Sequence, residues 1–374
     1  MKKALLQYGG AGIAIGAIAS WLVRQGNPGN MGVCIACFVR DSAGAFGGAS
    51  LNMGGVAYLR PEIPGLVLGA ALAAVAARDF RARGGPAFVL RFVMGFIFMA
   101  AALVFLGCTV RAWLRLGGGD LNALVGVVGL AAGIAAGSAF LRAGYTLGRS
   151  RDLPSASGWI VPVAAVVLLG LGAAASLGAT PELLTVTPAD APTPGGKRAP
   201  LLVSLLAGLV VGVIAQRSRI CTTGGIRDVI LWRRFDKLFG IVGLVAGALA
   251  MNLVLGQFRL GFAGQPVAHA EPLANFAAMA VAGLAAVLMG GCPLRQVVMA
   301  GEGDVDAGGA LLGMSAGAFF AHGAQLASSP RGAAPGALTM LAVMALVLVG
   351  IGFLRRERQP AAAADPSAAT RPDA

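Results

Sequence analysis

The sequence predicts an all-α polytopic membrane protein of about ten spans, arranged as two inverted five-helix repeats with cysteine-bearing re-entrant loops or half-helices. Three observations lead to this fold class. Hydrophobic residues make up 57% of the 374 residues and charged residues only 12%, whereas soluble domains average about 25% charged residues. Several apolar runs approach the roughly 20 residues needed to cross a bilayer. The two halves of the chain also repeat each other in register.

Ten apolar runs are the candidate spans. They cover residues 4–23, 62–78, 88–107, 121–143, 159–178, 200–216, 238–257, 273–291, 306–326 and 336–354. The first run follows Lys2 and Lys3 as a signal peptide would, and Ala17-Ile18-Ala19 resembles a cleavage site. We expect an uncleaved anchor, because this run has a counterpart later in the chain.

Lysine and arginine residues between the spans predict the orientation. With the N-terminus inside, the inner segments hold 20 of these residues and the outer segments hold 9. Because cytoplasmic loops are enriched in Lys and Arg, both termini are expected in the cytoplasm. The net charge of +13 does not indicate nucleic-acid binding, because the basic residues lie between apolar runs and form no stripe with aromatic residues.

The internal repeat consists of four elements that share the order cysteine, arginine, aspartate. They are Cys34 with Arg40 and Asp41, Cys108 with Arg111 and Asp120, Cys221 with Arg227 and Asp228, and Cys292 with Arg295 and Asp304. The first element matches the third at an offset of 187 residues, and the second matches the fourth at 184. Five spans per half is an odd number, so the second half is expected to be inverted relative to the first.

The repeat predicts the domain organisation. Residues 1–180 form the first membrane repeat, 181–199 the outer linker, 200–356 the second membrane repeat, and 357–374 a disordered tail. The first-half cysteine segments then enter from outside and the second-half segments from inside. An hourglass with a central passage follows from this arrangement.

Cys108 and Cys292 each follow a glycine, and all four cysteines precede a polar stretch that contains glycine, arginine and aspartate. Such backbone is tolerated at membrane depth only inside protein or along a water-filled cavity, so the cysteines are expected near the N-termini of half-helices. Helix N-termini favour anions, and thiols are soft enough to suit sulfur or selenium. We therefore expect a substrate pathway with loop-bracing aspartates. The pathway residues are Cys34, Cys108, Cys221, Cys292, Arg40, Arg111, Arg227 and Arg295, and the bracing residues are Asp41, Asp120, Asp228 and Asp304.

Cys37 has no counterpart, because Gly224 occupies the matching position. Cys34 and Cys37 could therefore form the redox pair of a membrane thiol–disulfide oxidoreductase. That alternative needs a second redox pair or a quinone site, and the sequence indicates neither. A scaffold without transport is a third interpretation. No motif predicts a metal site, a cofactor or ATP-driven chemistry.

Three stretches resemble the YeeE/YedE family of bacterial inner-membrane proteins. They are NMGVCIACFVRD (30–41), QRSRICTTGGIRD (216–228) and GGCPLRQ (290–296). A fourth stretch, FLGCTVRAWLRLGGGDLNA (105–123), is similar to the YedE-related branch associated with selenium metabolism. The resemblance covers residues 10–355. One departure is that Thr109 follows Cys108, whereas Pro293 follows Cys292 as is common in the family, so the turn at Cys108 could differ.

The resemblance implies uptake of a sulfur or selenium species through an hourglass pathway whose central cysteines contact the substrate. Carried over by motif, Cys34, Cys108 and Cys292 are the best candidates, with Cys221 as the fourth. The leading prediction is an inner-membrane permease, not an enzyme, that imports a small sulfur- or selenium-containing anion such as thiosulfate. By family analogy, a cytoplasmic sulfur-carrier protein is its partner.

Overall fold

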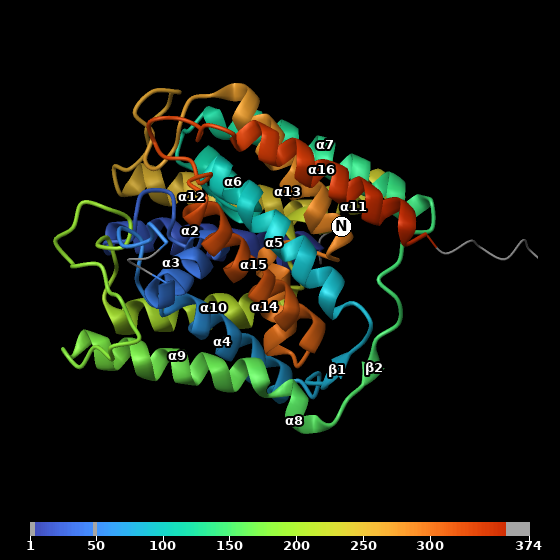
Figure 1. The fold of residues 1–374 in the computed structure, drawn as a ribbon, viewed down its shortest axis with the longest axis horizontal. Coiled ribbons are helices and arrows are strands. Elements are labelled where there is room, and N and C mark those ends of the chain that lie inside the picture. The colour runs from blue at the N-terminus through green and yellow to red at the C-terminus, as the bar shows by residue number, and fades with distance from the viewer. Residues whose placement is uncertain (1–3, 48–50, 357–374) are drawn as a thin grey trace, which may run out of the picture.

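The computed structural model describes residues 4–47 and 51–356, which form a bundle of helices (Figure 1). The first half contains η1 (Leu5–Gly9), α2 (Gly10–Arg24), α3 (Ile35–Gly47), α4 (Glu62–Ala76), α5 (Phe88–Phe105), α6 (Thr109–Gly117), α7 (Asn122–Arg142), α8 (Ser155–Gly158) and α9 (Ile160–Ser176). The second half contains α10 (Leu201–Ser218), α11 (Thr222–Trp232), α12 (Leu238–Val254), α13 (Pro272–Leu288), α14 (Pro293–Gly301), α15 (Val305–Gly323) and α16 (Ala337–Leu354). Two short strands, β1 (Arg83–Gly84) and β2 (Arg151–Asp152), pair antiparallel. The predicted tail, 357–374, lies outside the described residues.

Each of the ten predicted runs coincides with a helix, so the helical class is confirmed. Within the described residues, six segments are long and apolar enough to cross a membrane. They are Leu5–Arg24, Phe88–Gly117, Asn122–Arg142, Leu201–Trp232, Pro272–Gly301 and Ala337–Leu354. Three further apolar helices, α4, α9 and α12, are shorter. The total of ten spans stays a prediction.

The helices of the two halves pack mainly on each other. α2 packs on α12 as α10 packs on α4, and α5 packs on α15 as α13 packs on α7. Glycines line these four contacts, because small residues let helix backbones approach closely. A Cβ atom on Gly133 of α7 would lie 1.9 Å from the carbonyl oxygen of Ala280 on α13. The close approach of α7 and α13 therefore depends on glycine at position 133.

The described ends of the chain lie on the same side of the bundle. In Figure 1 the N-terminal end and the end of α16 are on the right, whereas the linker between α9 and α10 is on the left. The short helices divide in the same way, with α3 and α6 toward the linker side and α11 toward the side of the chain ends. We call these the outer and inner sides, following the predicted orientation.

Three long helical segments are broken just before a cysteine. The residue two positions before the cysteine has a positive φ in each case, at Leu106 (62°), Arg219 (55°) and Gly290 (95°). Residues with a side chain rarely adopt this conformation, so the breaks at Leu106 and Arg219 are held by the surrounding structure. A short helix of 9 to 11 residues then begins directly after the cysteine. The predicted position of the cysteines at half-helix N-termini is confirmed.

Candidate functional site

The N-termini of four short helices meet at the centre of the bundle, and each carries one of the predicted cysteines. On the outer side, Cys34 Sγ lies 3.7 Å from Cys108 Sγ. On the inner side, the backbone N–H of Cys292 donates to Cys221 Sγ at 3.3 Å. All four residues are buried, with at most 7% of their surface exposed. Four elements that are far apart in the sequence thus form one continuous site.

Thr109 and Thr222 join the outer and inner cysteines. Thr109 is the first residue of α6 after Cys108, and Thr222 is the first residue of α11 after Cys221. Their hydroxyl oxygens lie 2.8 Å apart, and both residues are fully buried. This contact links the two sides of the site directly.

The turn at Cys108 does not differ from the turn at Cys292. Cys108 caps α6 with φ −85° and ψ 179°, and Cys292 caps α14 with φ −66° and ψ 164°. Both conformations are extended, as is typical of N-cap residues. Thr109 and Pro293 therefore occupy the same first position of their helices, and both residue types are compatible with it.

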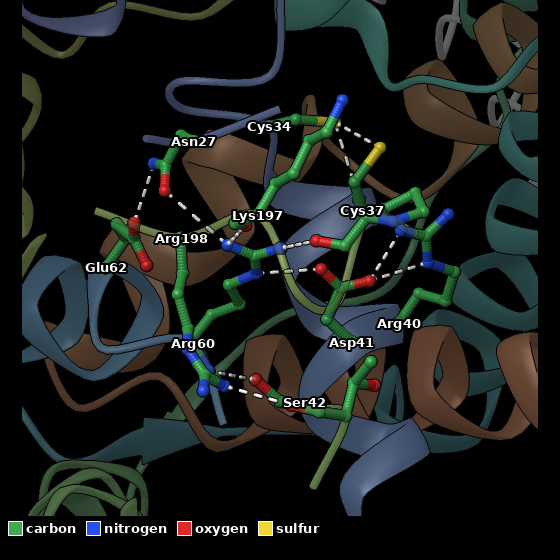
Figure 2. Close-up of polar contacts among 12 residues, drawn as sticks. Asn27, Cys34, Cys37, Arg40, Asp41, Ser42, Arg60, Glu62, Lys197 and Arg198 are labelled. Carbon is green, nitrogen blue, oxygen red and sulfur yellow. Dashed lines mark hydrogen bonds and ion pairs between the residues drawn. The ribbon is translucent and has the colours of Figure 1, made fainter. Parts of the chain in front are cut away.

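Cys37 belongs to the outer group, although it has no counterpart in the second half. Its Sγ lies 2.8 Å from Cys34 Sγ, and both thiols appear side by side in Figure 2. All five cysteines are free. The structure also corrects one argument against a redox function, because Cys221 and Cys292 lie together and supply the second thiol pair that the sequence did not reveal. No group in the described residues is arranged to hold a metal ion.

An outer cluster of charges surrounds the carboxylate of Asp41 (Figure 2). Arg40 Nε donates to Asp41 Oδ1 at 2.8 Å, and Arg60 Nε donates to Asp41 Oδ2 at 2.7 Å. Arg60 also donates to the linker carbonyls of Pro194 and Lys197, at 2.6 and 3.0 Å. The cluster thus ties α3, the loop before α4 and the linker together.

Tyr58 and Arg198 lie next to this cluster. The Arg198 guanidinium lies 4.5 Å from the centre of the Tyr58 ring, a cation–π distance. Burial raises the pKa of the Tyr58 hydroxyl, and the neighbouring Glu62 carboxylate raises it further. Tyr58 therefore stays neutral and packs as an aromatic surface for the two arginines of this region, Arg60 and Arg198.

The inner counterpart of this cluster is built around Asp228. Arg227 Nε donates to Asp228 Oδ1 at 2.9 Å, and Lys237 Nζ donates to Asp228 Oδ2 at 2.7 Å. Lys237 directly precedes α12, as Arg60 nearly directly precedes α4. In both halves, therefore, the aspartate is shared between its neighbouring arginine and a cation at the start of the next long helix.

Arg111 does not pair with Asp120, although the two residues share a repeated element. Asp120 instead accepts from Arg115 Nε at 2.6 Å. Arg111 donates to backbone carbonyl oxygens, including those of Asn30 and Val267 at 3.1 Å. Its Nη1 also lies 4.0 Å from the Sγ of a cysteine in the outer group, Cys37. Of the four predicted arginines, Arg111 alone has no carboxylate partner within the described residues.

Arg295 does not pair with Asp304 either. Its Nη1 donates to Glu302 Oε1 at 3.2 Å, and Asp304 accepts from Arg83 and Arg91, each at 3.2 Å. Arg83 also donates to Glu302 at 3.3 Å. The positive charge of Arg295 is therefore compensated by Glu302, whereas that of its repeat partner Arg111 is not compensated by a carboxylate.

Sequence reasoning missed several residues of the site. They are Arg60, Arg115, Lys237, Glu302 and the hydroxyl pair of Thr109 and Thr222. Arg60 and Lys237 had a signal in the sequence, because each is the last basic residue before an apolar run that follows an Arg-Asp pair. The hydroxyl pair had none, because its two members come from positions that the repeat does not match.

A cavity of about 430 Å³ lies away from the cysteines, between α9 and the helices α4, α14 and α15. Its lining is mostly apolar and includes Ile63, Val161 and Leu311. None of the five cysteines lines it. It is therefore separate from the site at the four helix N-termini.

Comparison with known proteins agrees with the cysteine motifs. Residues 217–371, which include Cys221 and Cys292, match the family described as Sulphur transport. Over 115 residues the chain is 31% identical to the thiosulfate transporter TsuA of Spirochaeta thermophila. That alignment covers 31% of this chain and 34% of the transporter, about a third of that relative's length. Both matches support the resemblance of the cysteine motifs to the YeeE/YedE family.

Proposed function

We propose that this protein is a membrane permease, not an enzyme, which imports a small sulfur-containing anion, with thiosulfate as the first candidate. The observation that carries the proposal is the convergence of four helix N-termini, each beginning at a buried cysteine. Helix N-termini stabilise anions through unpaired N–H groups and the positive end of the helix dipole. The thiols add weak donors. Weak contacts in series let an ion enter a site and leave it again.

In this proposal Cys34 and Cys108 of the outer group receive the anion, and Cys221 and Cys292 release it to the cytoplasm. Arg111 attracts the anion to the outer group, because its charge has no carboxylate partner among the described residues. The reciprocal packing of α2 on α12 and α10 on α4 supports two inverted five-span repeats. We further propose ten spans in a bacterial inner membrane and, from the distribution of lysine and arginine, both termini on the cytoplasmic side.

The resemblance of residues 105–123 to the selenium-associated branch extends the proposal to a selenium oxyanion. Sulfur and selenium oxyanions share charge and shape, so the same helix N-termini would accept both. A cytoplasmic sulfur-carrier protein would then collect the imported species at the inner side, where α11 and α14 end.

Uptake into proteoliposomes tests the proposal. Labelled thiosulfate and selenite are offered to the wild type, to Cys292→Ala and to Ser20→Ala. Ser20 is a matched control, because it is a buried small polar residue that donates to Ala248 at the α2–α12 contact. We expect uptake by the wild type and Ser20→Ala and its loss in Cys292→Ala. The absence of uptake by the wild type under several ion gradients would contradict the proposal.

A thiol–disulfide oxidoreductase is the second candidate, because the structure places Cys34 beside Cys37 and Cys221 beside Cys292. Such an enzyme passes electrons between two dithiol pairs and depends on both members of each pair. Cys37→Ala separates the candidates. The permease should keep most of its uptake through Cys34 and Cys108, whereas the oxidoreductase should lose all thiol oxidation, measured by thiol labelling on the two sides of the membrane.

A further inference from the structure

Thr109 and Thr222 lie where the outer cysteines of the proposed pathway meet the inner cysteines. Within the described residues, this is the one place where hydroxyl groups join the two sets of cysteines. The two oxygens are 2.8 Å apart, so one hydroxyl donates to the other. Cys108 and Cys221 directly precede the two threonines, and the backbone N–H of Cys292 donates to Cys221 Sγ at 3.3 Å. The pair therefore lies between the outer and the inner cysteines.

The hydroxyl pair does not follow from the duplication. Thr109 occupies the position of Pro293 in the second half, and Thr222 occupies the position of Ile35 in the first half. Pro293 starts α14 with the same N-cap geometry that Thr109 gives α6, so the hydroxyl is not needed to form the turn. The repeat copies thus show that apolar residues suit these helix positions. The two hydroxyls need another explanation.

Because the two hydroxyls are buried, their hydrogen bonding depends on what lies between the two oxygen atoms. Both residues are at most 1% exposed, so neither hydroxyl can turn to bulk water. A buried hydroxyl needs a partner, and a hydrogen bond to an anionic oxygen is stronger than one between two neutral hydroxyls. An oxyanion between the two threonines would therefore replace their mutual bond with two charge-assisted bonds.

We propose that Thr109 and Thr222 form the central gate of the pathway, which is closed when the hydroxyls bond to each other and is opened by the anion itself. The inference rests on the proposed function and adds the residues that control passage. Hydroxyls are stronger donors than thiols, so the pair favours an anion with oxygen atoms over a chalcogenide without them. The substrate class is therefore a sulfur or selenium oxyanion such as thiosulfate or selenite.

Isosteric substitutions test the gate. Thr109→Val and Thr222→Val remove one hydroxyl each and keep the shape of the side chain. We expect each to lower the maximal rate of thiosulfate uptake by about tenfold, the loss of one charge-assisted hydrogen bond, with little change in KM. The uptake rate of the double variant should be within about threefold of the rate of each single variant, because the two hydroxyls act as a unit. Thr109→Ser should recover most of the rate.

Thr223→Val is the matched control. Thr223 is the next residue of α11, is equally buried, and its hydroxyl has no partner in the part of the chain that the structure describes. We expect wild-type uptake from it. Unchanged or faster uptake by Thr109→Val and Thr222→Val would overturn the gate, and so would an equal loss in Thr223→Val. If one valine variant fails to fold, as judged by its melting temperature, the other carries the same test.

The two proposals fail in different ways. If the wild type transports thiosulfate and the threonine variants transport it equally well, only the gate is wrong. If the wild type transports neither oxyanion, the permease proposal is wrong as well. Labelled hydrogen sulfide, which has no oxygen atoms, provides a further comparison. Its uptake into empty liposomes is measured and subtracted. If the wild type then takes up sulfide faster than thiosulfate, the preference for an oxyanion is contradicted.

Discussion

Asp41 Oδ2 accepts a hydrogen bond of 2.7 Å from Arg60 Nε, and neither side chain is exposed. The inner counterpart joins Asp228 to Lys237 over the same distance, but these side chains are 11% and 28% exposed. Removing one partner of a buried ion pair leaves an uncompensated charge, whereas water screens an exposed pair. Loss of the Asp41–Arg60 pair should therefore lower the free energy of unfolding more than loss of the Asp228–Lys237 pair.

Asp41→Asn should lower the free energy of unfolding by about 3–5 kcal/mol, because it leaves Arg40 and Arg60 buried without a counter-charge. Asp228→Asn should cost about 1 kcal/mol, because water reaches its partners. Chemical unfolding of both variants in detergent, followed by circular dichroism, measures the difference. Equal losses would show that the two halves are more alike in burial than the structure indicates.

Arg111→Met should raise the KM for thiosulfate uptake by about tenfold, because it removes the one predicted arginine whose charge no described carboxylate compensates. Arg111→Lys keeps the charge but loses the planar set of donors that reaches several carbonyls. Its KM should therefore lie between that of the wild type and that of Arg111→Met. Arg295→Met is the comparison, since Glu302 already compensates Arg295. A larger rise in KM for Arg295→Met than for Arg111→Met would contradict this assignment.

Glu302→Gln should lower the free energy of unfolding by about 1.5–3 kcal/mol, the usual value of a hydrogen bond to a charged group. The Glu302 side chain is 2% exposed and pairs with Arg83, Arg219 and Arg295. Asp236→Asn is the control, because Asp236 pairs with Arg234 at an exposed position and should change stability by less than about 0.5 kcal/mol. Thermal unfolding in detergent compares the two, and a loss in Asp236→Asn that matches Glu302→Gln would count against a specific role for the buried carboxylate.

Gly133→Ala should destabilise the fold by about 1–3 kcal/mol, because the new methyl group would force α7 and α13 apart. Gly170→Ala on α9 provides the opposite case. No atom lies within 4 Å of a Cβ placed there, so this change should be neutral or should stabilise α9 by about 0.5–1 kcal/mol. The melting temperatures of Gly133→Ala and Gly170→Ala are compared. Equal melting temperatures would show that the α7–α13 contact is looser than described.

The long helices and the breaks before the cysteines could be predicted from the sequence. An apolar run of about 20 residues predicts a helix in the membrane, and glycine and cysteine residues that interrupt the run predict a break in that helix. Asp41 beside Arg40 was predictable for the same reason, because the two are neighbours in the chain. These features depend on residues that are close in sequence.

Partners that are distant in sequence could not be predicted. Arg111 lies in the same repeated element as Asp120, yet Arg115 takes that aspartate, because the helical geometry of α6 decides which side chain reaches it. The contact between Thr109 and Thr222 depends on how the two halves are set against each other, which the offsets of 184 and 187 residues do not reveal. The contact between Cys34 and Cys37, by contrast, was foreseeable from their spacing in the chain.

The pairing of α2 with α12, α4 with α10, α5 with α15 and α7 with α13 bears on how access to the centre can change. Every one of these pairs joins the first half to the second, and glycines hold their backbones in contact. A rocking motion of one half against the other would have to separate all four pairs at once. Movement confined to the ends of the short helices breaks none of them, so the scaffold favours a fixed frame in which only a few central side chains move with each passage.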